Sequence, residues 1–433
     1  MFREIFFHMQ DQDLIPHLFR TEYRKMISVL CKQFGLENIQ MAEDIVSDTF
    51  LLAAETWGLK GLPNNPTAWL YAISKNKAKD VFKHQAVFFN KIAPKLHLDA
   101  SENQLLEIDW SLKNIHDSQL TMMFAICHPS ISSEAQISLS LNLLCGFGVD
   151  EIADAFLSNR ENIYKRLSRA KEKLKAAKVK IELPSSSEIN LRLDRVLTTL
   201  YLLFSEGYYS TSQNQTLRKE LCVEAMRLTL MLIDDPRTDK PAANALLSLM
   251  CFHSSRFDAR TNDLGDLILY EEQDEKLWNH ELILKGQYYL NRSSRGTDIS
   301  KYHLEAAIAY WHTHKKDTME KWQNILQFYD QLLGLEYSPL IALNRFYVCS
   351  KVYSLQSPAS PQDLTQLILV AESLDLKENH LYHALMGKLY SGLKIDRAIH
   401  HYKLGMHLAK TSSDKSTLAN KIANLDKMNG KNN

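Results

Sequence analysis

The sequence has few residues that interrupt helices. It contains 14 glycines and 11 prolines in 433 residues, about half of their average usage. The six cysteines form no Cys-x-x-Cys pair, which excludes a disulfide scaffold and the usual zinc spacing. No apolar run reaches the roughly 18 residues that a membrane span needs. These absences predict an all-α protein of the cytoplasm, without a membrane span.

The chain also lacks net charge, since 51 basic side chains balance 51 acidic ones. A balance of zero argues against a polyanionic partner, because nucleic-acid binders usually carry a basic excess. The charge is nevertheless uneven. Residues 75–96 carry six basic and one acidic side chain, residues 97–159 carry one and nine, and residues 160–180 carry nine and two. Each basic block is either a solvated helix face or a binding surface.

The first helical unit is expected over residues 10–84. Asn65-Pro66 is a favourable helix start, because asparagine caps free amides and proline fits the first helical position. Lys75, Lys79 and Lys83 recur every four residues, which predicts that they line one exposed side of that helix. An acidic linker is expected over residues 85–116, where the apolar periodicity is lost.

A helix-turn-helix is predicted within a second unit, over residues 117–180. A short helix at Val149–Phe156 is followed by the tight connection Leu157-Ser158 and by Asn159 in an N-cap position. The next helix has an apolar stripe spaced by four, three and four residues, formed by Ile163, Leu167, Ala170 and Leu174. Its other faces are strongly basic, so it suits the major groove of DNA. The alternative is an αα-hairpin within a helical array.

Three segments together resemble a sigma factor of the extracytoplasmic-function type, in the sigma-70 superfamily. Ala42–Phe50 is similar to the region 2 helix that docks on the polymerase clamp helices. Asn65–Leu70, continuing through Asn76, Ala78 and Asp80, is similar to the helix that opens and reads the minus-ten element. Glu151–Ala153, with Arg166 to Leu174, matches region 4, which reads the minus-35 element. One departure is Leu157-Ser158, where the family usually has glycine and an apolar residue.

The resemblance implies partners and roles for named residues. The partners are promoter DNA and core RNA polymerase, through its clamp helices and flap. Polymerase contact is implied for Glu43, Asp44 and Asp48. Minus-ten contact is implied for Asn64, Asn65, Trp69, Lys75, Asn76, Lys79 and Lys83, with the loop Gly58–Asn64 forming a pocket for a flipped base. Minus-35 contact is implied for Arg160, Glu161, Asn162, Tyr164, Lys165, Arg166, Ser168, Arg169 and Lys171. The acidic residues 97–117 would occupy a polymerase channel. No catalytic residue, cofactor or metal is expected, so the chain is not read as an enzyme.

A long helical region follows the part that resembles most family members. We expect a regulatory array of the tetratricopeptide type over residues 185–410 and a polar tail over 411–433. Residues 380–409 are typical of one such helical hairpin. The segments Leu200–Tyr208 and Tyr270–Asp274 are similar to the sigma-factor subgroup with a large C-terminal extension. A signal protein or a ligand is expected at this domain.

Several polar residues of this region have no assigned role. His253 with Arg256, His312 with His314, and His400-His401 lack acids or cysteines at the spacing of metal ligands. Glu206, Glu271, Glu272 and Asp274 fit helix-end charges better than paired catalytic acids. Two other functions remain open: a helix-turn-helix regulator with a helical sensor or scaffold domain, and a helical-repeat scaffold with an incidental hairpin.

Overall fold

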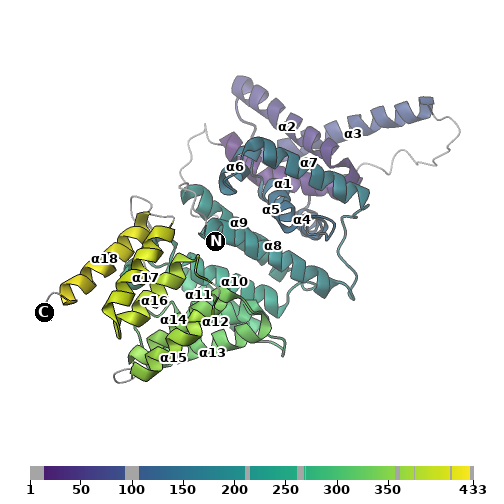
Figure 1. Cartoon of the computed structure of the whole chain (residues 1–433). Coiled ribbons are helices and arrows are strands. Elements are labelled where there is room, and N and C mark those ends of the chain that lie inside the picture. Colours follow the sequence, from purple (N-terminus) through teal and green to yellow (C-terminus); the bar gives the residue numbers. More distant parts are fainter. Residues whose placement is uncertain are drawn as a thin grey trace. The chain divides into compact units, whose positions relative to one another are not determined.

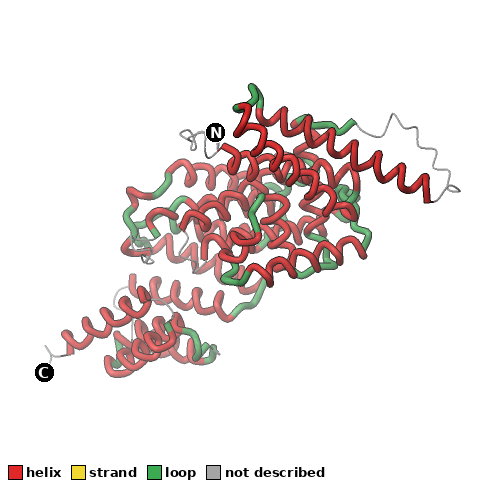
Figure 2. The backbone as a smooth tube through the Cα atoms, turned by 90° about the horizontal axis from the view of Figure 1, so that it is seen from above, coloured by secondary structure: helices red, strands yellow, loops and turns green. Residues whose placement is uncertain are grey.

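The computed structural model describes residues 14–92, 107–209, 215–260, 268, 270–355, 361–374, 376–409 and 412–429. Every regular element in these ranges is helical, which confirms the all-α prediction (Figures 1 and 2). The chain divides into two compact units, Met1–Thr238 and Asp239–Asn433. No helix in the described ranges is long and apolar enough to cross a membrane.

The first unit begins with the helices α1 (Leu14–Phe34), α2 (Ile39–Lys60) and α3 (Pro66–Ile92). Asn65 caps α3 as predicted, since its Oδ1 accepts a hydrogen bond from the Ala68 amide at 3.0 Å. The linker prediction was wrong at its start, because α3 continues to Ile92. No glycine or proline lies between Thr67 and Ala93, so the helix meets no breaker until it nears Pro94.

The next helices are α4 (Leu112–Ile126), α5 (Ser133–Leu139), α6 (Val149–Ala155) and α7 (Arg160–Ala176), with a π-helical turn at Ser140–Cys145. Helix α4 starts inside the segment that was expected to be linker. The side chain of Ser111 caps it by accepting a hydrogen bond from the Asn114 amide at 3.2 Å. Trp110 stacks on Tyr71 of α3 with ring centroids 4.6 Å apart. These contacts fasten α4 to the first three helices.

Helices α8 (Ile189–Tyr209) and α9 (Gln215–Asp234) complete the first unit. They were predicted to belong to a C-terminal domain that starts at residue 185, but they lie in the first unit, which ends at Thr238. Helix α8 packs on α4 and α5, and α9 packs on α4 and α6. Arg192 donates a hydrogen bond to the Phe124 carbonyl at 2.7 Å, and Thr199 donates one to Gln136 Oε1 at 3.0 Å. These polar contacts are buried or half-buried, so the hairpin shares the core of the first unit.

The second unit is a succession of helices, each packed against the next along the chain. They are α10 (Pro241–Ser254), α11 (His280–Ser293), α12 (Lys301–Trp311), α13 (Met319–Leu335), α14 (Pro339–Leu355), α15 (Pro361–Glu372), α16 (His380–Ser391), α17 (Ile395–Leu408) and α18 (Ser412–Asn429). Nearest-neighbour packing of this kind is characteristic of α-solenoid arrays. Three single-turn helices at Phe257–Ala259, Tyr270–Glu272 and Glu275–Leu277 lie between α10 and α11.

The hairpin predicted over residues 380–409 is present as α16 and α17. Gly387 is required there, because a Cβ atom would lie 2.5 Å from the ring of Tyr402. Within the polar tail expected over residues 411–433, the structure has a helix, α18, from Ser412 to Asn429. Leu418 of α18 is buried beside Gly405 of α17, and Leu425 packs against the core of the array, so two leucines anchor a mostly polar helix.

All six cysteines lie within the described residues, and each is a buried free thiol. Burial raises the pKa of Cys127 to about 11 and that of Cys251 to about 12. A raised pKa leaves little of the reactive thiolate at neutral pH. The cysteines therefore act as small apolar core residues, in agreement with their scattered spacing in the sequence.

Candidate nucleic-acid interface

Helices α6 and α7 are joined by a four-residue turn, Phe156–Asn159. Asn159 caps α7, because its Oδ1 accepts a hydrogen bond from the Asn162 amide at 2.8 Å. Glu151 Oε2 accepts one from the Gly148 amide at 2.8 Å and so closes the start of α6. Inside the turn, the Ser158 amide bonds the Ala153 carbonyl at 2.8 Å. The connection is thus fixed by local hydrogen bonds.

The inner face of α7 is the apolar stripe that the spacing predicted. Its members are at most 4 % exposed: Ile163, Leu167, Ala170 and Leu174. They hold α7 against α5 and α6. The polar side chains of α7 therefore face away from this core, and the orientation of the helix follows from the stripe.

The first turns of α7 present exposed polar and aromatic groups. Arg160, Glu161, Asn162 and Lys165 are exposed, and Tyr164 is 66 % exposed. Two ion pairs hold charges at this end: Lys165 contacts Glu161 at 2.5 Å, and Arg160 contacts Asp150 at 3.5 Å. Ser168 is half-buried. The residues expected to reach base edges accordingly lie at the accessible N-terminal end of α7.

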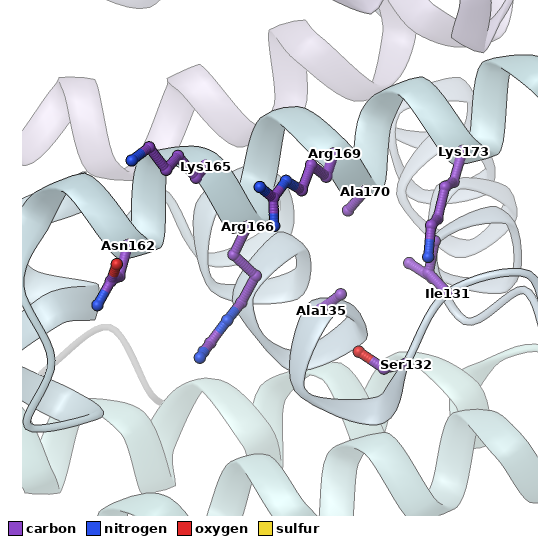
Figure 3. Close-up of a pocket in the computed structure, with 9 residues that line it drawn as sticks. All are labelled: Ile131, Ser132, Ala135, Asn162, Lys165, Arg166, Arg169, Ala170 and Lys173. Atoms are coloured by element: carbon purple, nitrogen blue, oxygen red, sulfur yellow. The ribbon is translucent and has the colours of Figure 1, made fainter.

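A basic pocket of about 470 Å³ lies between α7 and the start of α5 (Figure 3). Asn162, Lys165, Arg166, Arg169 and Lys173 line it from α7, facing Ile131, Ser132 and Ala135. Arg166 is held in place, because its guanidinium lies 5.2 Å from the centroid of the Phe156 ring, contacts Ser138 Oγ at 3.4 Å and pairs with Glu134 at 3.5 Å. Among the described residues, no carboxylate pairs with Arg169 or Lys173. The pocket is therefore positively charged.

The residues with implied minus-ten roles lie on α3 and the loop before it. Asn64, Asn65 and Asn76 are exposed. Trp69 is half-buried against Trp57, with ring centroids 5.4 Å apart. Lys75 and Lys79 are half-buried, so they are less exposed than their spacing predicted, and the side chain of Lys83 lies outside the described residues. Apolar surface is exposed at Leu59, in the last turn of α2, and at Leu62, in the loop, which are 88 % and 45 % exposed.

The acidic residues of α2 do not share one environment. Asp44 and Asp48 are exposed, and Asp48 contacts Lys77 at 3.5 Å. Glu43 instead contacts Lys171 of α7 at 2.5 Å, and the two side chains are only 12 % and 17 % exposed. Two residues expected to bind different partners, polymerase and DNA, are therefore paired with each other in this arrangement.

Charged contacts that the sequence did not reveal join α1 to α6 and α9. Arg20 contacts Glu151 of α6 and also Glu220 of α9, the latter at 2.6 Å. Arg24 contacts Glu224 at 2.6 Å, and Arg227 contacts the same carboxylate at 2.8 Å. Burial alone would raise the pKa of Glu224, but Arg227 and Arg24 hold it below its ordinary value. No periodic pattern signals contacts between residues up to 200 positions apart.

The described geometry defines an all-α protein in which α6 and α7 are joined by a four-residue turn and a basic pocket lies along α7. A family model described as "Family of unknown function (DUF6596)" matches residues 192–294 of this chain. Uncharacterized protein R00370 of Rhizobium meliloti (strain 1021) is 29% identical over 317 residues, which cover 72% of this chain and 74% of the relative. No solved structure matches the chain. Neither description names an activity, so the assignment of function depends on the residues and their geometry.

Leu157 in the turn between α6 and α7 is the first residue to test. It has a φ of +48° and is 65 % exposed. A left-handed conformation costs a residue with a Cβ atom roughly 1–2 kcal/mol, and glycine avoids that strain. Leu157→Gly is expected to stabilise the chain by up to about 1 kcal/mol in urea unfolding. Leu157→Val should destabilise it, because a β-branched side chain tolerates positive φ poorly. A Val variant more stable than the Gly variant would contradict this account.

The Glu43–Lys171 pair is tested by a double-mutant cycle with Glu43→Gln and Lys171→Met. We expect a coupling of about 1 kcal/mol in the free energy of unfolding, because the partly buried pair is shielded from solvent. The exposed pair Glu161–Lys165 is a matched control and should couple by only about 0.3–0.5 kcal/mol. Additive effects at Glu43 and Lys171 would mean that the two side chains do not stabilise the packing of α2 against α7.

Proposed function

We propose that the protein is an alternative sigma factor that directs core RNA polymerase to its promoters. The observation that carries the proposal is the basic pocket along α7, on a helix-turn-helix whose accessible end carries Arg160, Asn162 and Lys165. A cationic stripe on the second helix of such a pair suits the major groove and the phosphates beside it. The order of the three sequence segments supports a sigma factor over a plain DNA-binding regulator.

In this proposal the start of α7 and its later turns have different roles in DNA binding. Arg160, Asn162 and Lys165 lie early in the helix and would contact base edges of the minus-35 element. Arg169 and Lys173 line the pocket further along, without carboxylate partners among the described residues, and would contact phosphates. Lys171 would contact phosphate only after leaving Glu43, so its contribution is coupled to the packing of α2 on α7.

The proposal assigns promoter opening to α3 and the loop that precedes it. Exposed asparagines at the start of α3 offer donors and acceptors to unpaired bases, and exposed Leu59 and Leu62 offer an apolar surface against which a base can rest. Asp44 and Asp48 on α2 would meet basic residues of the polymerase. The C-terminal array, α10 to α18, would regulate these activities.

The direct test is run-off transcription with purified core polymerase on a library of promoter fragments. We expect a promoter-dependent transcript from the full chain, from the chain truncated after Thr238, or from both. The truncation falls at the boundary between the two units, so it keeps α8 and α9 and the ion pairs of α9 with α1. A difference between the two forms would measure regulation by the second unit. Sequence-specific DNA binding without any transcript from either form would instead favour the helix-turn-helix regulator.

The phosphate role of Arg169 predicts a salt effect. Arg169→Ala should weaken binding to a mixed-sequence DNA duplex and lower the slope of log affinity against log salt by about one, because one phosphate contact is lost. Lys113→Ala is the matched control, since Lys113 is an exposed lysine at the start of α4, away from the pocket. An unchanged slope in Arg169→Ala would show that this part of α7 faces protein instead of DNA.

A further inference from the structure

A cluster of four cations in the second unit has no role in the proposed function. Its members are Arg256, which follows α10, Lys321 of α13, Lys351 of α14 and Lys388 of α16. We name these four residues the basic cluster. Only two carboxylates, Glu271 and Asp317, contact it among the described residues. The cluster therefore keeps an excess of positive charge.

Aromatic rings separate the cations of the basic cluster. Arg256 and Lys321 lie over the ring of Tyr270 at 5.4 and 5.0 Å. Lys351 lies over Trp322 at 5.4 Å, and Lys388 lies over Tyr347 at 4.7 Å. Ring faces partly compensate a desolvated cation, but they do not neutralise it. Cationic side chains and aromatic rings therefore alternate across α13, α14 and α16.

The two inner lysines are held in fixed positions. The ammonium of Lys321 is almost fully buried, and it donates to the Tyr270 hydroxyl at 3.1 Å and to the His314 carbonyl at 2.7 Å. Lys351 is 13 % exposed and bonds Glu271, with Asp317 at 3.3 Å. Lys388 is half-buried, and no carboxylate among the described residues pairs with it. An anion bound here would contact the ammonium of Lys388, beside Lys321 and Lys351, whose positions are fixed by hydrogen bonds.

Unsatisfied polar atoms surround the same cluster. His312 Nδ1, Arg256 Nε and Gln273 Oε1 are buried without a hydrogen-bond partner in the described part of the chain. Such atoms are rare in folded proteins and commonly mark a bound water or ion. Burial, followed by the charges of Arg256 and Lys321, lowers the pKa of His312 to about 3. Burial is the larger cause of this shift, so what favours an anion here is the excess of four cations over two contacting carboxylates among the described residues.

We propose that the basic cluster binds a small dianion of the organic phosphate or dicarboxylate class. Four cations against two carboxylates match a ligand with two negative charges. The exposed carboxylate of Glu271 already accepts from Lys351 and from the Tyr347 hydroxyl at 3.3 Å, so the ligand would compete with it or share its donors. The half-buried setting among rings suits a small anion better than a nucleic acid, whose phosphates need an open surface.

Ligand binding to the basic cluster can be measured through the change in protonation of Lys388. Burial, followed by the nearby Lys351, lowers the pKa of Lys388 to about 8, with Lys421 acting in the same direction and Glu271 and Asp317 opposing it. A bound dianion would raise that pKa, because it stabilises the ammonium form. Binding at pH 8 should therefore take up protons, up to about half a proton per site.

The test is isothermal titration of the full chain with inorganic phosphate and with succinate, at constant ionic strength. We expect saturable binding of at least one probe, with proton uptake at pH 8 that is measured in buffers of different ionisation enthalpy. The arm that binds identifies the class of the ligand. Absence of saturable binding by both probes would overturn the proposal. The measurement needs neither DNA nor polymerase, so it fails or succeeds independently of the sigma-factor assignment.

Four substitutions, one of them a control, locate the site. Lys388→Met keeps the length of the side chain and should weaken binding at least tenfold, whereas Glu271→Gln removes a competing carboxylate and should tighten it. Lys377→Met is the matched control, because Lys377 is exposed on the loop before α16. Lys388→Arg keeps the charge and should retain binding, which distinguishes loss of the site from loss of the fold. Unchanged affinity in Lys388→Met, or equal loss in Lys377→Met, would overturn the assignment.

Discussion

Arg20 and Arg24 on α1 hold together parts of the first unit that are far apart in the sequence. Arg20 reaches carboxylates on both α6 and α9, and Arg24 reaches Glu224, whose carboxylate also accepts from Arg227. Arg227 in turn donates to the Leu144 carbonyl at 2.7 Å, in the π-helical turn that precedes α6. Removing one partner of such a buried pair leaves an uncompensated charge, which destabilises a fold strongly. The position of α9 against the helix-turn-helix depends on this network.

The ion pairs of Arg20 and Arg24 with α9 help to define where the first unit ends. The first unit cannot end near residue 180, because its charged contacts and part of its core are completed by α8 and α9. The family match, residues 192–294, accordingly begins inside the first unit and ends in the second. The hairpin of α8 and α9 is thus part of the fold of the first unit, and the helices α10 to α18 form a separate array.

Features that depend on nearby residues could be predicted from the sequence. Asn65 and Asn159 cap α3 and α7 through bonds to amides three residues away, so the residue type and its position suffice. The apolar stripe of α7 was predictable because spacing along a helix fixes which side chains share a face. The hairpin of α16 and α17 was predictable for the same reason, since Gly387 and Tyr402 meet at a spacing that the repeat pattern contains.

Features that depend on distant contacts could not be predicted in this way. Glu43 and Lys171 are 128 positions apart, and each alone is typical of an exposed helix face. Lys75 and Lys79 were expected to be exposed, but periodicity does not reveal what packs beside a helix. The helix α18 was missed because its composition is polar and only a few apolar side chains, Leu418 and Leu425 among them, pack it against the array. The candidate site was therefore predictable on α7, but not its coupling to α2.

The ion pairs of the structure show which charges are paired within a chain whose net charge is zero. Several cations of the basic block 160–180 are neutralised within the first unit, Lys171 by Glu43 and Lys165 by Glu161. Arg169 and Lys173 keep their charge along an open helix, where successive phosphates of a polymer can meet them. Lys388 lies among rings and near buried polar atoms that lack hydrogen-bond partners, which is the setting proposed above for a small anion. Opposite charges cancel over the whole chain, but what each surface can bind depends on the cations that its neighbours leave unpaired.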